Sequence, residues 1–133
     1  RQMFGVRGAP GNTVNHATSY WVGNHSTRVF CDSVDVVAGI GWDKVDPDNP
    51  AYRFVNVFRV VSNLGVFDFG GPGHTMRAVS LHPGVEPDEV RENTAYEIHG
   101  LDDAATTRLA TGAELELIAK IDPKGLRDKE VKV

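Results

Sequence analysis

The sequence predicts a single domain of the α/β or α+β class, in which short strands dominate and helices lie between and after them. Several runs of aromatic and β-branched residues are bounded by Gly, Asn or Asp, which is typical of short buried strands. Two later segments carry helix-start signals. The chain has 133 residues, of which 41% are hydrophobic, enough for one packed core.

Composition excludes several classes of partner. The formal net charge is -4 and no cluster of Lys and Arg interrupts it, which argues against nucleic-acid binding. Cys31 is the single cysteine, and no apolar run reaches the roughly 18 residues of a membrane-spanning helix. We therefore expect a cytoplasmic protein with no membrane partner. Because the chain begins at Arg1 within what looks like the middle of a fold, we expect domain 1–133 to lack an N-terminal portion.

The first half of the chain starts with a stretch of three glycines and a proline, residues 4–17. Short strands are predicted at 19–22 and 34–37, and residues 24–26 between them form a loop. Two prolines and three Asx residues at 46–50 exclude a helix or central strand there and mark an exposed loop.

The second half contains a hairpin and two helices. Residues 52–62 are strand-like, and 66–69 and 76–81 are predicted to pair around a glycine-rich turn. Pro87 near a helix start, with acidic residues in the first turn, predicts a helix to about Asn93. Thr111 and Glu114 have the spacing of a capping box and begin a surface helix with an apolar stripe, followed by a charged tail over 127–132.

The opening stretch is the first candidate site. No Gly-Lys-Ser/Thr follows it and its glycines lack the dinucleotide-binding spacing, so neither nucleotide motif is present. Gly8 and Gly11 would let the backbone approach a ligand closely, with amides directed by the following helix start. A plain turn and a ligand-binding loop both remain open on the residues alone.

The other reactive side chains point to no catalytic constellation. The five histidines are dispersed without metal-ligand spacing, so we expect no metal site. His16 is the candidate among them, because it lies on the expected helix after the glycines. No Gly-X-Ser-X-Gly elbow occurs, which argues against a serine hydrolase. We expect Cys31 to be a small buried residue and Trp21 and Trp42 to be core aromatics.

Three segments carry a family resemblance. The stretches Arg59 to Phe69, Met76 to Val85 and Val90 to Thr94 closely resemble the C-terminal half of the β subunit of class I CoA-transferases, in the glutaconate CoA-transferase group. Their Leu-Gly-Val-Phe-Asp-Phe and Leu-His-Pro-Gly-Val pieces are the specific ones. The resemblance spans nearly the whole chain.

The resemblance implies an open α/β sheet with flanking helices, in a β subunit that pairs with an α subunit as an α2β2 enzyme. It implies an acyl-CoA thioester as substrate and no resident cofactor. The Gly-X-Gly-Gly-Ala loop of that family falls on Val6 to Pro10, where one of its three glycines is kept. The glutamate that forms the covalent intermediate belongs to the N-terminal half, so the catalytic residue is unknown here.

The altered loop, together with Ser19 to His25, resembles a divergent branch of actinobacterial, steroid-degrading, CoA-transferase-like hydrolases. That resemblance implies hydrolytic retro-Claisen opening of a ring in a steroid-derived CoA thioester, with a carboxylate base from the α subunit. The substrate-binding residues it implies are Arg7, Gly8, Ala9, Gly11, Asn12 and His16. The alternatives are an ordinary acyl-CoA:carboxylate CoA-transferase subunit and a non-catalytic scaffold for an active α subunit.

Overall fold

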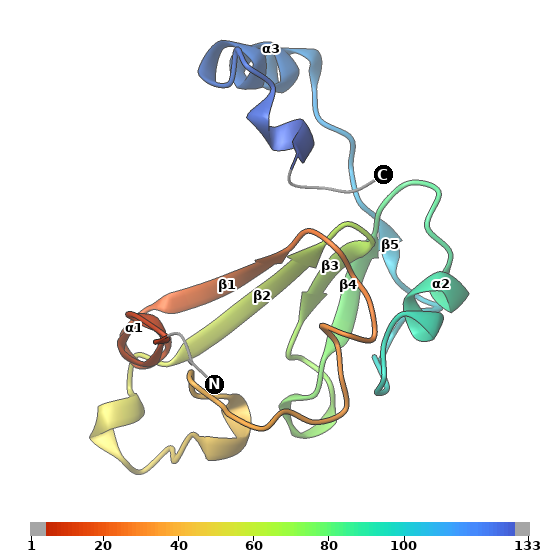
Figure 1. Cartoon of the computed structure of the whole chain (residues 1–133). Helices are drawn as coiled ribbons and strands as arrows, with labels where there is room; N and C mark the ends of the chain where they lie inside the picture. The colour runs from red at the N-terminus through yellow and green to blue at the C-terminus, as the bar shows by residue number, and fades with distance from the viewer. Residues whose placement is uncertain (1–4, 130–133) are drawn as a thin grey trace.

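The computed structural model describes residues 5–129 and confirms the mixed α/β class; Phe4 of the opening stretch and residues 130–132 of the charged tail lie outside this range. The sheet has five strands in the order β1-β2-β3-β4-β5 (Figure 1). Its strands are β1 (Ala17–Val22), β2 (Asn56–Ser62), β3 (Gly65–Asp68), β4 (Arg77–Leu81) and β5 (Ala105–Thr106). The helices are α1 (Ala9–Asn15), α2 (Pro87–Glu92) and α3 (Gly112–Ile121), with short 3-10 turns η1 (Trp42–Lys44), η2 (Pro50–Tyr52), η3 (Pro72–His74) and η4 (Leu126–Lys129).

The strands pair in a mixed pattern. Strand β1 is parallel to β2 and β4 is parallel to β5, whereas β2, β3 and β4 form an antiparallel meander. The predicted hairpin of β3 and β4 is therefore confirmed. On the β1 side, Thr18 pairs with Val57 and Ser19 with Arg59, so Phe58 is the extra residue of a β-bulge. This irregularity accounts for an exposed phenylalanine within a strand.

The core joins the meander to α2 and the segment that follows it. Phe67 on β3 and Val90 on α2 are completely buried, and the remaining core residues surround them: Phe30, Val60, Leu64, Met76, Ala78, Leu81, Ile98 and Leu101. Val90 lies in the helix predicted to run to about Asn93, and the structure confirms that helix. Burying these apolar side chains is the main favourable contribution to folding.

His25 is a buried polar residue within this core. Its ring stacks on Phe30 at 3.7 Å between centroids, and its two nitrogens lie 2.8 Å from Ser62 Oγ and 2.9 Å from Thr94 Oγ1. The sequence placed His25 in a loop and gave no sign of these contacts. Burial lowers the pKa of His25 from 6.5 to about 4, because a charged imidazole would lose its hydration.

The neighbours of His25 define its tautomer. Ser62 Oγ accepts a hydrogen bond from the backbone N–H of Leu64, which leaves its own proton for His25 Nδ1. Thr94 Oγ1 donates to the carbonyl of Val90 and therefore accepts from His25 Nε2–H. The neutral Nε2–H imidazole satisfies every group in the network, whereas a proton on Nδ1 would leave the Nε2 lone pair facing Thr94 Oγ1, whose own proton goes to the Val90 carbonyl.

Two predictions about the first half are wrong. Residues 34–37 form no strand and run as an irregular segment in which Val36 is 62% and Val37 75% exposed. A strand needs a neighbouring backbone for its hydrogen bonds, and this segment pairs with none in the described range. Trp21 is not a core residue, because it lies on edge strand β1 and is 56% exposed. Cys31 is partly buried.

The capping box at α3 is confirmed. Thr111 Oγ1 accepts from the backbone N–H of Glu114, and the Glu114 carboxylate accepts from the backbone N–H of Thr111. The guanidinium of Arg108, with help from Thr111, lowers the pKa of Glu114 to about 2. Helix α3 stands away from the sheet (Figure 1), and its apolar residues Leu115 and Ile118 are exposed. None of the helices over residues 5–129 has the length and apolarity required to cross a membrane.

Candidate functional site

The glycine stretch at the start of the chain forms helix α1 itself. Gly8 is its N-cap and Pro10 lies in its first turn, where a missing N–H costs no hydrogen bond. The expected helix therefore forms, but it begins within the glycine stretch, and the expectation that it carries His16 is wrong. The helix ends at Asn15, and His16 has extended backbone angles at the C-cap. Gly11 inside the helix lowers its stability by only about 1 kcal/mol.

The candidate substrate-binding residues lie along α1 and at its start. Arg7 precedes the helix with φ of 54°, a left-handed conformation that few non-glycine residues adopt. The Asn12 side chain lies against Gly8, where an added Cβ would be 3.5 Å from Asn12 Nδ2. The structure thus brings Arg7, Gly8 and Asn12 together at one end of α1, with Ala9 and Gly11 beside them. His16 lies at the other end, about 10 Å away for seven helical residues.

All six of these residues are exposed. Thr13, between Asn12 and Val14, is the buried residue of this helix, because only 2% of it is exposed. Thr13 Oγ1 lies 3.1 and 3.0 Å from the carbonyls of Ala9 and Pro10, to which it can donate, and it accepts from the backbone N–H of Ile40 at 3.1 Å. This contact fastens the segment around Ile40 to α1.

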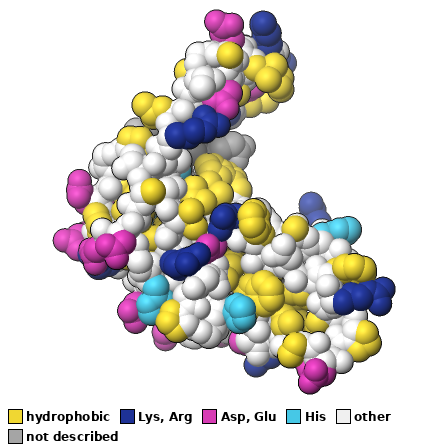
Figure 2. Space-filling view, turned by 180° about the vertical axis from the view of Figure 1, so that it is seen from behind, with side chains coloured by type: hydrophobic (Ala, Val, Ile, Leu, Met, Phe, Trp, Pro, Cys, Tyr) yellow, Lys and Arg dark blue, Asp and Glu magenta, His cyan; other side chains and the backbone are white. Residues whose placement is uncertain are grey.

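An apolar cavity of about 410 Å³ lies beside this contact. Six residues that carry its apolar walls are Tyr20, Val37, Ile40, Trp42, Val57 and Phe69. Gly39 also lines it, and a Cβ there would lie 3.0 Å from Thr13 Cγ2 and 3.7 Å from the Tyr20 hydroxyl. A side chain at position 39 would therefore require the Thr13 methyl to shift slightly, whereas its contact with Tyr20 would be an ordinary one. Figure 2 shows hydrophobic side chains gathered over the end of the molecule that carries α1.

Trp42 separates this cavity from a second one. The second cavity, of about 290 Å³, shares Trp42, Val57 and Phe69 and extends to His74. The Trp42 indole N–H donates to the carbonyl of Val57 at 3.1 Å, and its ring stacks on His74 at 4.8 Å between centroids. The sequence predicted Trp42 to be a core aromatic. The structure confirms this only in part, since Trp42 is half-buried and lines both cavities.

Arg59 and Asp68, which line part of the second cavity, belong to an ion pair network. Asp68 Oδ2 lies 2.7 Å from Arg77 Nη2 and 3.0 Å from Arg59 Nη1. The hydrogen bonds from Arg77 contribute most to lowering the pKa of Asp68 to about 2, so the carboxylate stays charged near neutral pH. The two arginines already share this anion, which makes the network a structural clamp between β2, β3 and β4.

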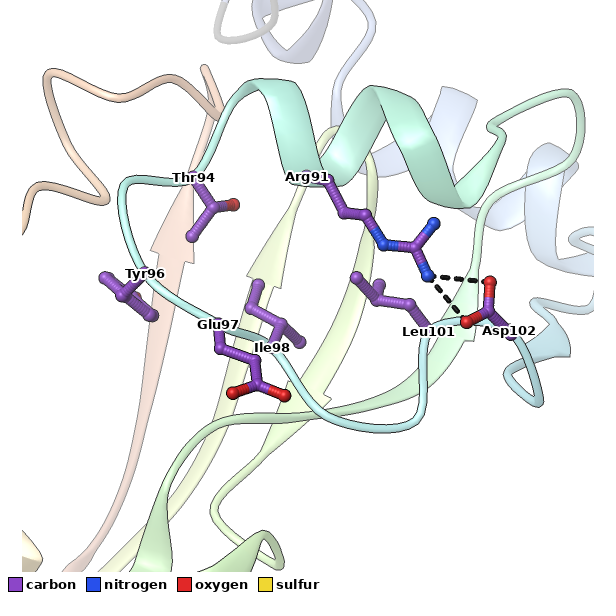
Figure 3. A pocket seen from close by; sticks show the side chains of 7 residues that line it. All are labelled: Arg91, Thr94, Tyr96, Glu97, Ile98, Leu101 and Asp102. Carbon is purple, nitrogen blue, oxygen red and sulfur yellow. Dashed lines mark hydrogen bonds and ion pairs between the residues drawn. The ribbon is translucent and has the colours of Figure 1, made fainter.

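A third cavity, of about 360 Å³, lies beneath α2 (Figure 3). Arg91 projects from α2 onto Asp102 at one end of it, at 2.6 Å, and also contacts Asp88 at 2.6 Å. A phosphate would have to compete with these two carboxylates for the guanidinium. None of the six candidate residues lines this cavity, and none lines the cavity of about 410 Å³ either. We regard the end of the molecule that carries α1 as the candidate functional site, because Thr13 on α1 bonds to Ile40 in the wall of the cavity of about 410 Å³.

Residues 5–129 contain no group of three or more His, Cys, Asp or Glu side chains placed to hold a metal ion. Sequence reasoning found the glycine stretch but missed Thr13 and the cavity. The only sign of Thr13 was its place in the expected helix. Nothing local marked the cavity, because its walls come from β1, the segment around Ile40, η1, β2 and Phe69 just after β3.

Comparison with known proteins gives close matches, although no family model matches the chain. The "Cholesterol ring-cleaving hydrolase IpdB subunit" of Mycobacterium tuberculosis (strain ATCC 25618 / H37Rv) is 74% identical over 133 residues. That alignment covers 99% of this chain and 53% of the relative. The chain therefore spans about half the length of the curated relatives it matches.

Solved structures extend the comparison to the fold. The crystal structure of Rhodococcus jostii RHA1 IpdAB matches with a TM-score of 0.95 and 66% identity, covering 100% of this chain and 54% of that one. Glutaconate coenzyme A-transferase from Acidaminococcus fermentans matches with a TM-score of 0.73 and 23% identity, covering 90% and 46%. The resemblance read from the sequence is confirmed: this chain has the CoA-transferase fold, and along its whole length it is similar to about half of an IpdB subunit.

Proposed function

We propose that this chain is part of the β subunit of a heteromeric enzyme that hydrolytically opens a ring of a steroid-derived CoA thioester. The observation that carries the proposal is the match to IpdAB, at 66% identity and a TM-score of 0.95 over the full chain. The name of the 74% identical relative, a cholesterol ring-cleaving hydrolase subunit, supplies the reaction class. We further propose an α2β2 assembly in the cytoplasm, with no resident cofactor.

The proposed reaction is a hydrolytic retro-Claisen cleavage. Water, deprotonated by a carboxylate of the α subunit, adds to a ring ketone and forms a tetrahedral alkoxide. The ring carbon–carbon bond then breaks, the former ketone becomes a carboxylic acid, and the bonding electrons form an enolate that is protonated at carbon. Negative charge develops on oxygen in both steps, so oriented hydrogen-bond donors lower the barrier.

The exposed polar residues at α1 are suited to this task. Arg7 directly precedes Gly8, and the Asn12 side chain lies against Gly8, so a guanidinium and an amide are available at this end of the helix to donate to a developing oxyanion. Gly8 between them has no side chain to obstruct the substrate, and Ala9 and Gly11 continue the same small-residue surface. His16, at the opposite end, can donate to a more distant polar group of the substrate.

We expect Arg7→Ala and Asn12→Ala each to lower kcat about a hundredfold, the effect of removing one oxyanion donor. The measurement is ring-opened acid formed by the full-length subunit in complex with its α subunit. Asn15→Ala is the matched control, since Asn15 lies on the same helix but donates to the carbonyl of Gly11. If Arg7, Asn12 and His16 can all become alanine in an intact complex without changing turnover, the chain is a scaffold.

Covalent trapping distinguishes hydrolysis from CoA transfer. A transferase passes through a glutamyl-CoA thioester, which borohydride reduces and so marks on the protein. The hydrolase is expected to give no such adduct and no exchange of CoA between acids. A trapped adduct together with exchange would make the chain an ordinary CoA-transferase subunit. The mass of the complex by light scattering tests the α2β2 assembly.

A further inference from the structure

We infer that Thr13 is a positioning residue, which anchors α1 and thereby fixes where Arg7 and Asn12 are presented to the substrate. This inference rests on the proposed function and adds to it a residue that makes no contact with the substrate itself, because only 2% of Thr13 is exposed. Its hydrogen-bond partners belong to this same chain, so the anchor does not depend on a neighbouring subunit.

Helix α1 is poorly stabilised by its own sequence. It has seven residues, whereas isolated helices shorter than about 12–15 residues are marginal in water. Its N-cap, Gly8, makes no side-chain hydrogen bond, and neither an acidic residue in the first turn nor a basic residue in the last turn complements the helix dipole. Gly11 inside the helix weakens it further. The position of α1 therefore depends on its contacts with the rest of the protein.

Thr13 supplies such a contact. It is the buried residue of α1, and its methyl group lies against Gly39, where an added Cβ would be 3.0 Å from Thr13 Cγ2. Its hydroxyl lies 3.1 Å from the carbonyl of Ala9 and 3.0 Å from that of Pro10, to which it can donate its proton. The hydroxyl oxygen then accepts from the backbone N–H of Ile40 at 3.1 Å. One side chain thus joins the first turn of α1 to the segment around Ile40.

The proposed donors are coupled to Thr13 through the backbone of α1. Asn12 directly precedes Thr13; its N–H donates to the carbonyl of Gly8 at 2.9 Å, and its carbonyl accepts from the N–H of His16 at 3.0 Å. Successive residues of a helix point about 100° apart, so Thr13 is buried while Asn12 stays exposed. Arg7 has a φ of 54°, a conformation that persists only where the surrounding structure holds it. A tilt of α1 about Thr13 would therefore displace both donors.

Removing the hydroxyl of Thr13 tests the anchor. Thr13→Val keeps the shape of the side chain but removes the acceptor for the Ile40 N–H. In the full-length subunit in complex with its α subunit, acting on a CoA thioester that carries a ring ketone, we expect kcat to fall about tenfold, since a misplacement of about 1 Å can cost about a hundredfold. KM is expected to change less than about twofold, because the donors act on charge that develops in the transition state. Thr13→Ser keeps the hydroxyl and is expected to restore kcat.

Thr94→Val is the matched control. Thr94 is 8% exposed, donates to the carbonyl of Val90 and accepts from His25, so it makes the same kinds of hydrogen bond as Thr13. It follows α2, and α1 and α2 lie beside opposite edges of the sheet (Figure 1). Thr94→Val is expected to lower the urea midpoint, as Thr13→Val does, and to leave kcat unchanged.

A second substitution displaces α1 while the hydroxyl stays in place. Gly39→Ala would put a Cβ 3.0 Å from Thr13 Cγ2, so the helix is expected to move by a few tenths of an ångström. On the same scale of displacement, kcat is expected to fall about threefold. Thr13→Ser removes the methyl group that the new Cβ would crowd, and the double variant Gly39→Ala/Thr13→Ser is expected to recover kcat. Such non-additivity would mean that the effect of position 39 passes through Thr13.

Hydrogen exchange separates the anchor from the proposed function. Mass spectrometry of the same complex follows the amides of residues 5–16 and of the segment around Ile40. Thr13→Val is expected to speed exchange in both, because the bond that joins them is lost, whereas Thr94→Val is expected to change neither.

The outcomes are distinct. If Thr13→Val leaves this exchange unchanged, if it leaves kcat unchanged while Arg7→Ala and Asn12→Ala lower it, or if Thr94→Val lowers kcat as much, the inference is overturned. If Thr13→Val speeds exchange but Arg7→Ala and Asn12→Ala do not alter turnover, Thr13 is still the anchor of α1, and it is the proposed role of the donors that fails.

Discussion

Acidification from pH 7 to pH 4 is expected to lower the free energy of unfolding by about 3 kcal/mol through His25 alone. The pKa of His25 is about 4 in the folded protein and 6.5 when it is unperturbed. As the pH falls below 6.5, the unfolded chain binds a proton at this position and the folded chain does not. The loss therefore accumulates between pH 6.5 and pH 4, and above pH 6.5 the contribution of His25 is constant.

The measurement is the urea midpoint of the full-length protein at several pH values between 7 and 4. His25→Gln, which cannot titrate in this range, is expected to flatten the profile. His16→Gln, at an exposed histidine, serves as the control and is expected to leave the profile unchanged. Asp68 has its pKa at about 2 and contributes its own loss only below about pH 4. An NMR titration that placed the pKa of His25 near 6.5 would contradict this account, whatever the variants do.

Replacing Phe67 by alanine is expected to cost about 3–5 kcal/mol, the largest stability loss for a single substitution in this core. Phe67 is completely buried on β3, where it pairs with Val60 on β2 and Ala78 on β4. Its ring also meets His25 edge-on at 5.5 Å between centroids. Because strand side chains project from the face of the sheet, the cavity left by alanine would lie over the three central strands, within the core, and could not collapse without moving the packed elements.

Denaturant unfolding of the full-length protein measures this loss. Phe54→Ala is the matched control, because the Phe54 side chain is 55% exposed and its removal is expected to cost less than about 1 kcal/mol. Phe67→Leu, which refills part of the volume, is expected to fall between the two. Equal losses for Phe67→Ala and Phe54→Ala would mean that β3 does not form the centre of the core.

The parts of the fold that sequence reasoning predicted are those that depend on neighbours along the chain. The hairpin around the glycine-rich turn, the proline at the start of α2 and the capping box of α3 are each specified within a few residues. Residues 34–37 show the opposite case. Their composition favours a strand, but strand formation depends on a distant partner, and the sheet places none beside them.

The candidate site was also predictable only in part. The glycine stretch was recognisable, and Pro10 directly after Gly8 and Ala9 is a signal for a helix start that could have located α1 within the stretch. The cavity of about 410 Å³ was not predictable, since its walls come from β1, the segment around Ile40, η1, β2 and Phe69 just after β3. The network of His25 with Ser62 and Thr94 joins residues 37 and 69 positions apart, and no local pattern announces such a contact.

The position of β1 has a consequence for handling the protein. Over residues 5–129, β1 pairs on one side only, with β2, and its sequence from Ala17 to Val22 contains neither a charge nor a proline. Natural edge strands commonly use such residues to discourage added strands. A shortened version of the subunit in which β1 stays uncovered is thus open to aggregation by β-strand addition. A lysine at Trp21, whose side chain is already exposed, would be the most direct protection.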